Sequence, residues 1–117
     1  MDRDLNKRLF DFSILVIKFL KTLENTPENK VIRHQLIKAV TSAGANYEES
    51  QAASSRADFR NKIQISLREM RETNYWLRIM ETLENKKQND IKILVQESEE
   101  LKKILGSISV KVSKKQI

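Results

Sequence analysis

The sequence predicts an all-α protein, an antiparallel up-down-up-down four-helix bundle, and three observations lead to this fold class. Apolar residues recur at intervals of four and three along four long segments, which is the spacing of helices that bury one face. The 117 residues include only two glycines and one proline, so β-hairpins lack the turn residues that they need. The breaks between the segments are short, and short connections make successive helices antiparallel. We therefore expect residues 1–117 to form a single domain with one core.

The first two helices are predicted at about residues 4–24 and 27–51. Thr26 is the expected N-cap of the second helix, with Pro27 at its first position, where a proline loses no hydrogen bond. Gly44 lies in a run of small residues within that helix. We expect a neighbouring backbone to approach it closely, because an interior glycine costs about 1 kcal/mol relative to alanine. The expected buried positions are Leu5, Leu9, Phe12, Val16, Phe19 and Leu23, followed by Ile32, Leu36, Ala39, Ala43, Asn46 and Ser50.

The last two helices are predicted at about residues 56–84 and 90–112. Ser55, with Asp58 three residues later, resembles a capping box in which Asp replaces the usual Glu or Gln. Asp90 is expected to cap the fourth helix, and the tail from Ser113 is expected to fray. The expected buried positions are Phe59, Ile63, Leu67, Met70, Asn74 and Leu77, followed by Ile91, Leu94, Val95, Ser98, Leu101, Leu105, Ile108 and Val112.

The sequence contains no recognisable catalytic or cofactor motif. It has no cysteine, which excludes disulfides, thiolate metal sites and cysteine nucleophiles. The single histidine, His34, has no glutamate three residues before it, so the Glu-x-x-His pattern of di-iron bundles is absent. No glycine-rich phosphate-binding loop occurs. We expect a protein that is not an enzyme and that uses no metal, cofactor or small-molecule substrate.

The N-terminus does not resemble a signal peptide, because it is charged and leads directly into an amphipathic segment. The longest uninterrupted apolar run covers residues 14–17, whereas a membrane span needs about 20 residues. We therefore expect a cytoplasmic protein without a membrane segment.

The charge of the chain suggests a polyanionic partner. The formal net charge is +6, and residues 85–117 contain eight lysines against four acidic residues. Such an excess favours RNA or DNA, but a solvated helix face with a soluble tail has the same composition. The candidate nucleic-acid contacts are Arg56, Arg60, Lys62, Lys86, Lys87 and Lys92. They lie at opposite ends of the third helix, about 36–40 Å apart, so only a symmetric oligomer would join copies of each group into a basic rim.

The third helix carries a second stripe, about a third of a turn away from its buried face. The stripe consists of Ile65, Glu69, Glu72, Trp76, Ile79 and Leu83. Phe10, Ile14, Ile17, Ile37, Val40 and Tyr47 add apolar positions outside the main faces of the first two helices. Large exposed apolar patches commonly mark interfaces, and tryptophan is enriched in interface hot spots. We expect this stripe to be an interface between subunits; the alternative is a wide bundle whose corners these residues fill.

Two amides occupy positions predicted to be buried, Asn46 in the second helix and Asn74 in the third. A buried amide without partners costs about 1–3 kcal/mol. Each should therefore be hydrogen-bonded to a neighbouring helix, with Asn46 bonded to Asn74 or to a backbone carbonyl. Glu69 and Glu72 share one face and are flanked by Arg68 and Arg71. We expect salt bridges there, such as Arg68 with Glu72 or pairs between subunits, in preference to a metal site.

Several runs of residues resemble one protein family. Residues 41–49 (TSAGANYEE), the following Ala57-Asp58-Phe59, and residues 67–77 (LREMRETNYWL) are similar to the bacterial four helix bundle protein family. Its members include proteins encoded within intervening sequences of 23S rRNA genes, and the accessory protein of diversity-generating retroelements is a more distant relative. The resemblance covers roughly Leu9 to Leu105. It implies an up-down-up-down bundle, assembly into a ring, with a pentamer suggested, and association with nucleic acid.

Two functional hypotheses follow. The first is a non-enzymatic, ring-forming bundle that binds structured RNA, or an RNA–protein complex, through lysine and arginine, mainly by phosphate contacts. The alternative is a protein-interaction scaffold that uses the second stripe of the third helix without nucleic acid. Neither the nucleic acid, the protein partner, the biological process nor the exact oligomer number follows from the sequence.

Overall fold

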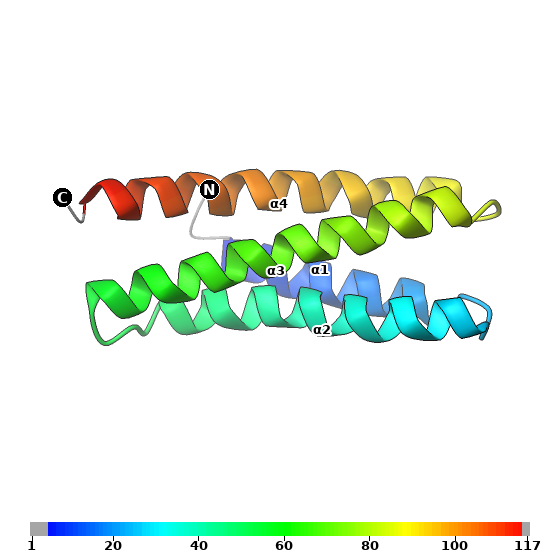
Figure 1. Ribbon diagram of the computed structural model, residues 1–117, viewed down its shortest axis with the longest axis horizontal. Coiled ribbons are helices and arrows are strands. Elements are labelled where there is room, and N and C mark those ends of the chain that lie inside the picture. Colours follow the sequence, from blue (N-terminus) through cyan, green and yellow to red (C-terminus); the bar gives the residue numbers. More distant parts are fainter. Residues whose placement is uncertain (1–4, 116–117) are drawn as a thin grey trace.

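The computed structural model describes residues 5–115, with side chains through Ser113. Four antiparallel helices run up-down-up-down (Figure 1): α1 (Leu5–Leu20), α2 (Pro27–Ser50), α3 (Arg56–Leu83) and α4 (Gln88–Lys115). The bundle is elongated, with extents of 48 × 21 × 20 Å. The α1–α2 and α3–α4 connections lie at one end, and the α2–α3 connection lies at the other. The predicted fold class is confirmed.

Two helix starts follow the predicted capping chemistry. Thr26 Oγ1 accepts a hydrogen bond from the Asn29 amide at 3.1 Å, and Pro27 is the first residue of α2. Ser55 Oγ accepts from the Asp58 amide at 3.0 Å. The Asp58 carboxylate bonds back to the amide of Ser54 at 3.1 Å, one residue before the N-cap. This amide, helped by Lys62, holds the pKa of Asp58 below its ordinary value.

Two predicted boundaries are wrong. Helix α1 ends at Leu20, not near residue 24. The chain then forms a turn in which the amides of Thr22 and Leu23 donate hydrogen bonds to the carbonyls three residues earlier, at 2.9 and 3.3 Å. The Arg33 guanidinium donates to the carbonyls of Leu20 and Leu23, both at 3.4 Å, and so supplies donors to the end of α1.

At the other boundary, α4 begins at Gln88, so Asp90 lies within its first turn and does not cap it. A carboxylate there still interacts favourably with the N-terminal end of the helix dipole. The Gln88 side chain folds back to donate to the Glu81 carbonyl at 2.8 Å. Helix α4 also continues through Ser113 to Lys115. The helix therefore extends past its predicted end at residue 112, the fraying of the tail stays a prediction, and residues 116–117 lie outside the described part.

The core runs the length of the bundle and is wider than predicted. Val40 and Tyr47, which we placed outside the main face of the second helix, are buried in it. Two buried serines tie helices together: Ser66 Oγ donates to the Ala43 carbonyl at 2.7 Å, and Ser13 Oγ to the Val40 carbonyl at 3.2 Å. The other fully buried large side chains are Leu9, Phe12, Val16, Leu20, Leu36, Ile63, Met70, Leu77, Ile91, Leu101 and Leu105.

Gly44 faces α1, as expected, but the approach is not tight. A Cβ atom at this position would lie 3.7 Å from Ser13 Oγ and 3.8 Å from Leu9 Cβ, which is ordinary van der Waals contact. The α1 backbone does lie beside Gly44, since the Leu9 carbonyl oxygen would be 3.8 Å from that Cβ atom, but an alanine would fit without displacing α1.

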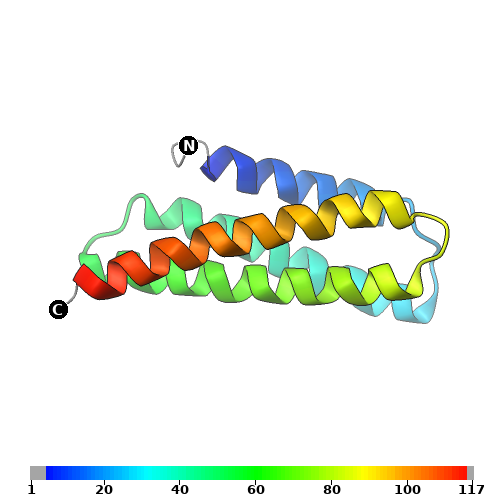
Figure 2. The ribbon, with the colours of Figure 1, turned by 90° about the horizontal axis from the view of Figure 1, so that it is seen from above.

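The edge between α1 and α4 is the loosest in the bundle, and the two helices diverge toward the start of α1 (Figure 2). Arg8 bridges this edge. Its guanidinium bonds both carboxylate oxygens of Glu97, at 2.6 and 2.8 Å, and reaches Glu100 at 2.6 Å. These hydrogen bonds raise the pKa of Arg8 above its ordinary value. We call these bonds from Arg8 to Glu97 and Glu100 the Arg8 clasp. They pair two of the acidic residues of α4 within the bundle.

Candidate nucleic-acid interface

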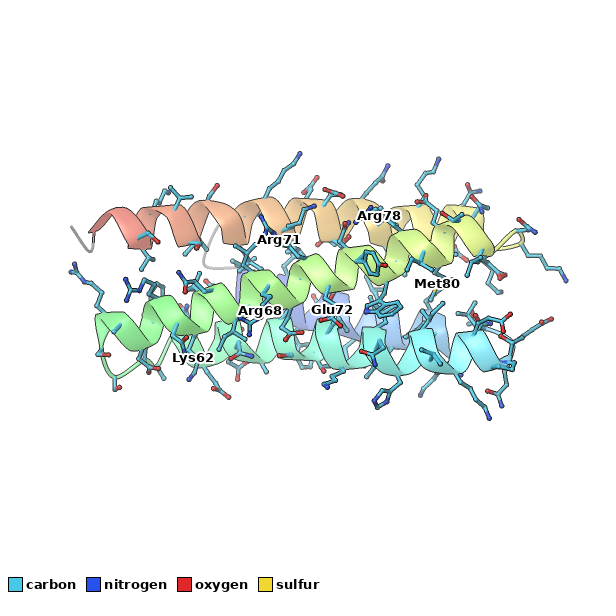
Figure 3. The ribbon with its side chains drawn as sticks, viewed as in Figure 1. Lys62, Arg68, Arg71, Glu72, Arg78 and Met80 are labelled. Atoms are coloured by element: carbon cyan, nitrogen blue, oxygen red, sulfur yellow. The ribbon has the colours of Figure 1, made fainter. Side chains whose placement is uncertain are left out.

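A basic groove lies between α3 and α4. It has a volume of about 490 Å³ and is lined by Leu67, Arg71, Asn74, Arg78, Lys102, Lys103 and Gly106. Figure 3 shows Arg71 and Arg78 directed between the two helices, whereas Lys62, Arg68 and Glu72 lie toward α2. A Cβ atom at Gly106 would meet nothing within 4 Å, so the groove is open beside this residue. Arginine and lysine supply most of the polar lining, which makes the groove strongly basic.

Helical spacing explains why the cations gather. Arg60, Arg71 and Arg78 are separated by eleven and seven residues, both close to whole numbers of helical turns, so they lie on one flank of α3. That flank faces α4, where Lys102 and Lys103 stand near the same level. Arg71 and Arg78 are about 10 Å apart along the axis at 1.5 Å per residue. The result is a band of positive charge parallel to the helices.

Asn74 forms the base of the groove and is only 1 % exposed. Its side-chain nitrogen donates to Ser98 Oγ at 2.9 Å and to the Glu99 carboxylate at 3.0 Å. Its carbonyl oxygen accepts from Arg78 Nε at 2.9 Å. This network fixes the inner edge of the Arg78 guanidinium and leaves its remaining N–H groups without a hydrogen bond to residues 5–115. Arg78 is therefore oriented before any ligand arrives.

The acids near the groove are already engaged. Glu99 pairs with Lys102 at 3.2 Å, and the hydrogen bond from Lys102, followed by that from Asn74, lowers the pKa of Glu99. Arg71 and Lys103 are exposed and form no ion pair with any residue of the described range 5–115. With Glu97 and Glu100 held by Arg8, the acidic stretch of α4 does not neutralise the band.

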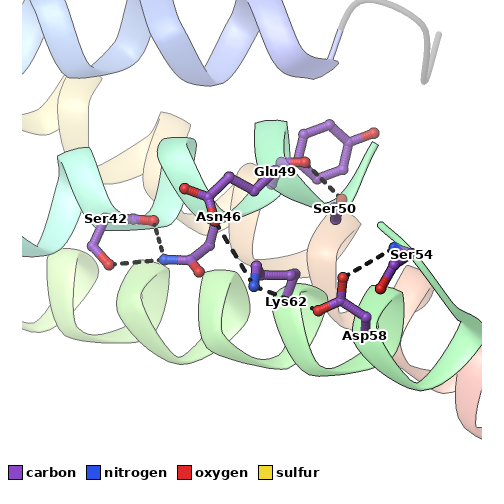
Figure 4. Close-up of polar contacts among 8 residues, drawn as sticks. Ser42, Asn46, Glu49, Ser50, Ser54, Asp58 and Lys62 are labelled. Atoms are coloured by element: carbon purple, nitrogen blue, oxygen red, sulfur yellow. Dashed lines mark hydrogen bonds and ion pairs between the residues drawn. The ribbon is translucent and has the colours of Figure 1, made fainter. Parts of the chain in front are cut away.

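The six predicted nucleic-acid contacts divide between the two ends of α3, as expected. Lys86 and Lys92 are exposed and Lys87 is half-buried, beside the α3–α4 connection. Lys62 is already paired with Glu49 at 3.8 Å and Asp58 at 3.5 Å (Figure 4). At the same end of α3, Arg56 is exposed but has an interaction partner, and half-buried Arg60 extends the basic band. Sequence reasoning missed Arg71, Arg78, Lys102 and Lys103, which line the basic groove, although the spacing of Arg60, Arg71 and Arg78 was a usable signal.

The two amides predicted to be buried behave differently. Asn74 bonds across to α4 through Ser98 and Glu99. Asn46 is half-buried, and its side-chain nitrogen donates to the carbonyl and hydroxyl oxygens of Ser42 in its own helix, at 2.9 and 3.1 Å (Figure 4). The expected bond from Asn46 to Asn74 or to another helix is therefore wrong, because Asn46 lies at the edge of the α2–α3 contact.

The second stripe of α3 is only partly exposed. Trp76 and Ile79 pack against the core, Ile65 and Glu69 are half-buried, and Leu83 is 59 % exposed at the end of the helix. Glu72 is exposed and accepts a hydrogen bond from Trp76 Nε1 at 3.2 Å. The expected Arg68–Glu72 pair does not form among residues 5–115. The wide-bundle alternative thus accounts for Trp76 and Ile79, and the subunit interface stays a prediction.

Nothing in the described part points to catalysis. Among residues 5–115, no three His, Asp or Glu side chains come together to hold a metal ion. His34 is exposed on α2, away from the basic groove. None of the helices, over the residues the structure describes, has the length and apolar character needed to cross a membrane.

Comparisons with known proteins agree with this architecture. The profile of a family described as 23S rRNA-intervening sequence protein matches residues 1–107. A crystal structure of a protein of unknown function from the S23 ribosomal protein family of Bacteroides thetaiotaomicron is 33 % identical. It matches with a TM-score of 0.81 over 90 % of this chain and 97 % of that one. A search of curated proteins finds no match.

Proposed function

The chain belongs to the 23S rRNA-intervening sequence protein family, and from this premise we propose that it is a non-enzymatic bundle that binds structured RNA through the basic groove between α3 and α4. The observation that carries the proposal is the groove's charge balance. Arg71, Arg78, Lys102 and Lys103 line one open groove against a single nearby carboxylate, that of Glu99, which is paired with Lys102 and also lies near Arg78. Such a surface attracts the phosphates of RNA whatever its nucleotide sequence.

The network at Asn74 supports a phosphate-binding role. Arginine binds phosphate with two parallel N–H groups when its planar guanidinium is correctly oriented. The Asn74 carbonyl holds Arg78 by its Nε atom, so the terminal nitrogens are free to bind without a large loss of side-chain entropy. Lysines such as Lys103 add charge without fixed geometry.

Lys86, Lys87 and Lys92 remain a second candidate contact surface, at the end of the bundle. Within a ring of subunits this end would display one copy of the group per subunit. In a single chain the α3–α4 groove gathers more cations along one line, and we therefore place the principal contacts there.

The test is RNA binding measured by fluorescence anisotropy across a salt series, with Arg71→Gln/Lys103→Gln as the groove variant. The affinity should fall for all RNA sequences alike, because phosphate contacts carry no base information. The slope of log K against log salt should flatten by about 0.7–0.9 for each phosphate that the variant no longer binds. Lys86→Gln/Lys87→Gln/Lys92→Gln tests the other end in the same way.

The matched control is Lys18→Gln/Lys38→Gln, which removes the same charge from exposed positions of α1 and α2. If the control and the groove variant lose affinity equally, net charge alone explains the binding and the groove has no special role. If the wild-type protein shows no salt-sensitive binding to RNA, the protein-interaction scaffold becomes the better hypothesis.

A further inference from the structure

Tyr75 stands beside the basic groove, on the solvent side of α3. Tyr75 is 51 % exposed, so about half of the residue is accessible to a ligand. Arg71 lies one turn before it and Arg78 one turn after it. Tyr75 therefore lies on the outer surface of α3, with Arg71 and Arg78 on the side toward α4 and Arg68, two turns earlier, on the side toward α2.

The ring of Tyr75 is supported by its neighbours. It meets the Trp76 ring edge to face, with centroids 5.5 Å apart and planes at 75°. The Arg78 guanidinium carbon lies 5.9 Å from the Tyr75 centroid, within the range of a cation–π contact. Trp76 is in turn fixed by Glu72 and by the core. The ring therefore projects from a rigid base and needs little ordering to bind a flat ligand.

An exposed aromatic ring between arginines is the combination that single-stranded nucleic acids require. Cations hold the phosphates, while the aromatic ring stacks on a base whose face is free. Bases in a duplex are already stacked on each other, so protein aromatics reach only unpaired nucleotides in loops, bulges and ends.

We infer that Tyr75 is a stacking platform for an unpaired RNA base whose flanking phosphates are bound by Arg71 and Arg78. The inference rests on the proposed function and narrows it, from structured RNA in general to RNA that presents an unpaired nucleotide at this groove.

The experiment compares three fluorescent or competing probes: an unstructured 12-nucleotide RNA, a blunt duplex of the same length, and inorganic polyphosphate, which has charge but no bases. Tyr75→Ala should weaken binding of the single strand by roughly 5- to 150-fold, the effect of removing one base–aromatic stack. It should leave the duplex and polyphosphate unchanged. Tyr75→Phe keeps the ring and should bind all three probes like the wild-type protein.

The inference is overturned if Tyr75→Ala binds the single strand as well as the wild-type protein does. It is also overturned if the variant loses affinity equally for polyphosphate, or if its only effect is a smaller particle in sedimentation, which would identify a protein interface. These results differ from failure of the proposed function, in which the wild-type protein binds none of the three probes in a salt-sensitive manner. Circular dichroism checks that Tyr75→Ala remains helical.

Discussion

Asn74 and Asn46 allow one substitution to be compared in two environments. Both lie well inside long helices, so replacing either with alanine raises intrinsic helix propensity by the same amount. That contribution cancels in the difference between Asn74→Ala and Asn46→Ala. What remains is the difference between a buried amide bonded across to α4 and a half-buried amide bonded within α2.

The magnitude follows from the contacts. Asn74 loses three hydrogen bonds, each worth about 0.5–1.5 kcal/mol, or about 1.5–4.5 kcal/mol in total. Water can replace the amide at Glu99 and Arg78, which reach the surface, but not at Ser98, which is fully buried. We therefore expect the lower half of this range, with Asn74→Ala about 1.5–3 kcal/mol less stable than Asn46→Ala.

Urea denaturation followed by circular dichroism measures the difference. With a slope of about 2 kcal/mol per molar urea, the midpoint of Asn74→Ala should lie roughly 1 M below that of Asn46→Ala. Asn46→Ala itself should remain near the wild-type midpoint, because water can replace the two bonds to Ser42 at this half-buried position and alanine has the higher helix propensity. Equal midpoints for the two variants, at equal slopes, would refute the assignment of Asn74 as the structural amide.

Three further outcomes are expected. Gly44→Ala should raise the free energy of unfolding by about 0.5–1 kcal/mol in the same urea assay, because the new methyl group makes only ordinary contacts and helix propensity improves; a loss of stability would mean that the methyl group clashes with α1. The folded-state pKa of Asp58 is depressed, so its contribution to stability is present above the unfolded pKa and is lost as the pH falls through the lower folded value. Asp58→Asn should therefore be less stable than the wild-type protein at neutral pH, and the gap should close below about pH 4, while a gap independent of pH would contradict this. Leu83→Glu should reduce particle mass in sedimentation without loss of helicity if the second stripe of α3 is a subunit interface, and an unchanged mass would place Leu83 outside it.

The sequence predicted best those features that depend on nearby residues. The starts of α2 and α3 were correct because Thr26 and Ser55 supply capping oxygens to amides three residues later. The end of α1 was missed because no glycine or proline marks it, and Arg33, thirteen residues beyond Leu20, supplies the donors. The start of α4 was missed because Gln88, not Asp90, satisfies the preceding turn.

Features that depend on how the helices face each other were harder to predict. Asn46 and Asn74 occupy equivalent positions in their own patterns, and only the placement of α4 beside α3 distinguishes them. Predicting the basic band also requires knowing that α4 lies beside α3. The spacing of Arg71 and Arg78 indicates one flank of a helix, a signal that we missed, and the sequence alone does not place Lys102 and Lys103 opposite them.

Because the first helix is short, the four helices are not expected to be held in the bundle with equal stability. Helix α1 has 16 residues, whereas α3 and α4 have 28 each, and its border with α4 is bridged mainly by the Arg8 clasp. Because α1 is the shortest helix and has the loosest border, we expect it to be the unit that detaches at the lowest free energy. The basic groove lies wholly on α3 and α4. Detachment of α1 would therefore leave the two helices that line the groove in place, but it would also release Glu97 and Glu100 from Arg8.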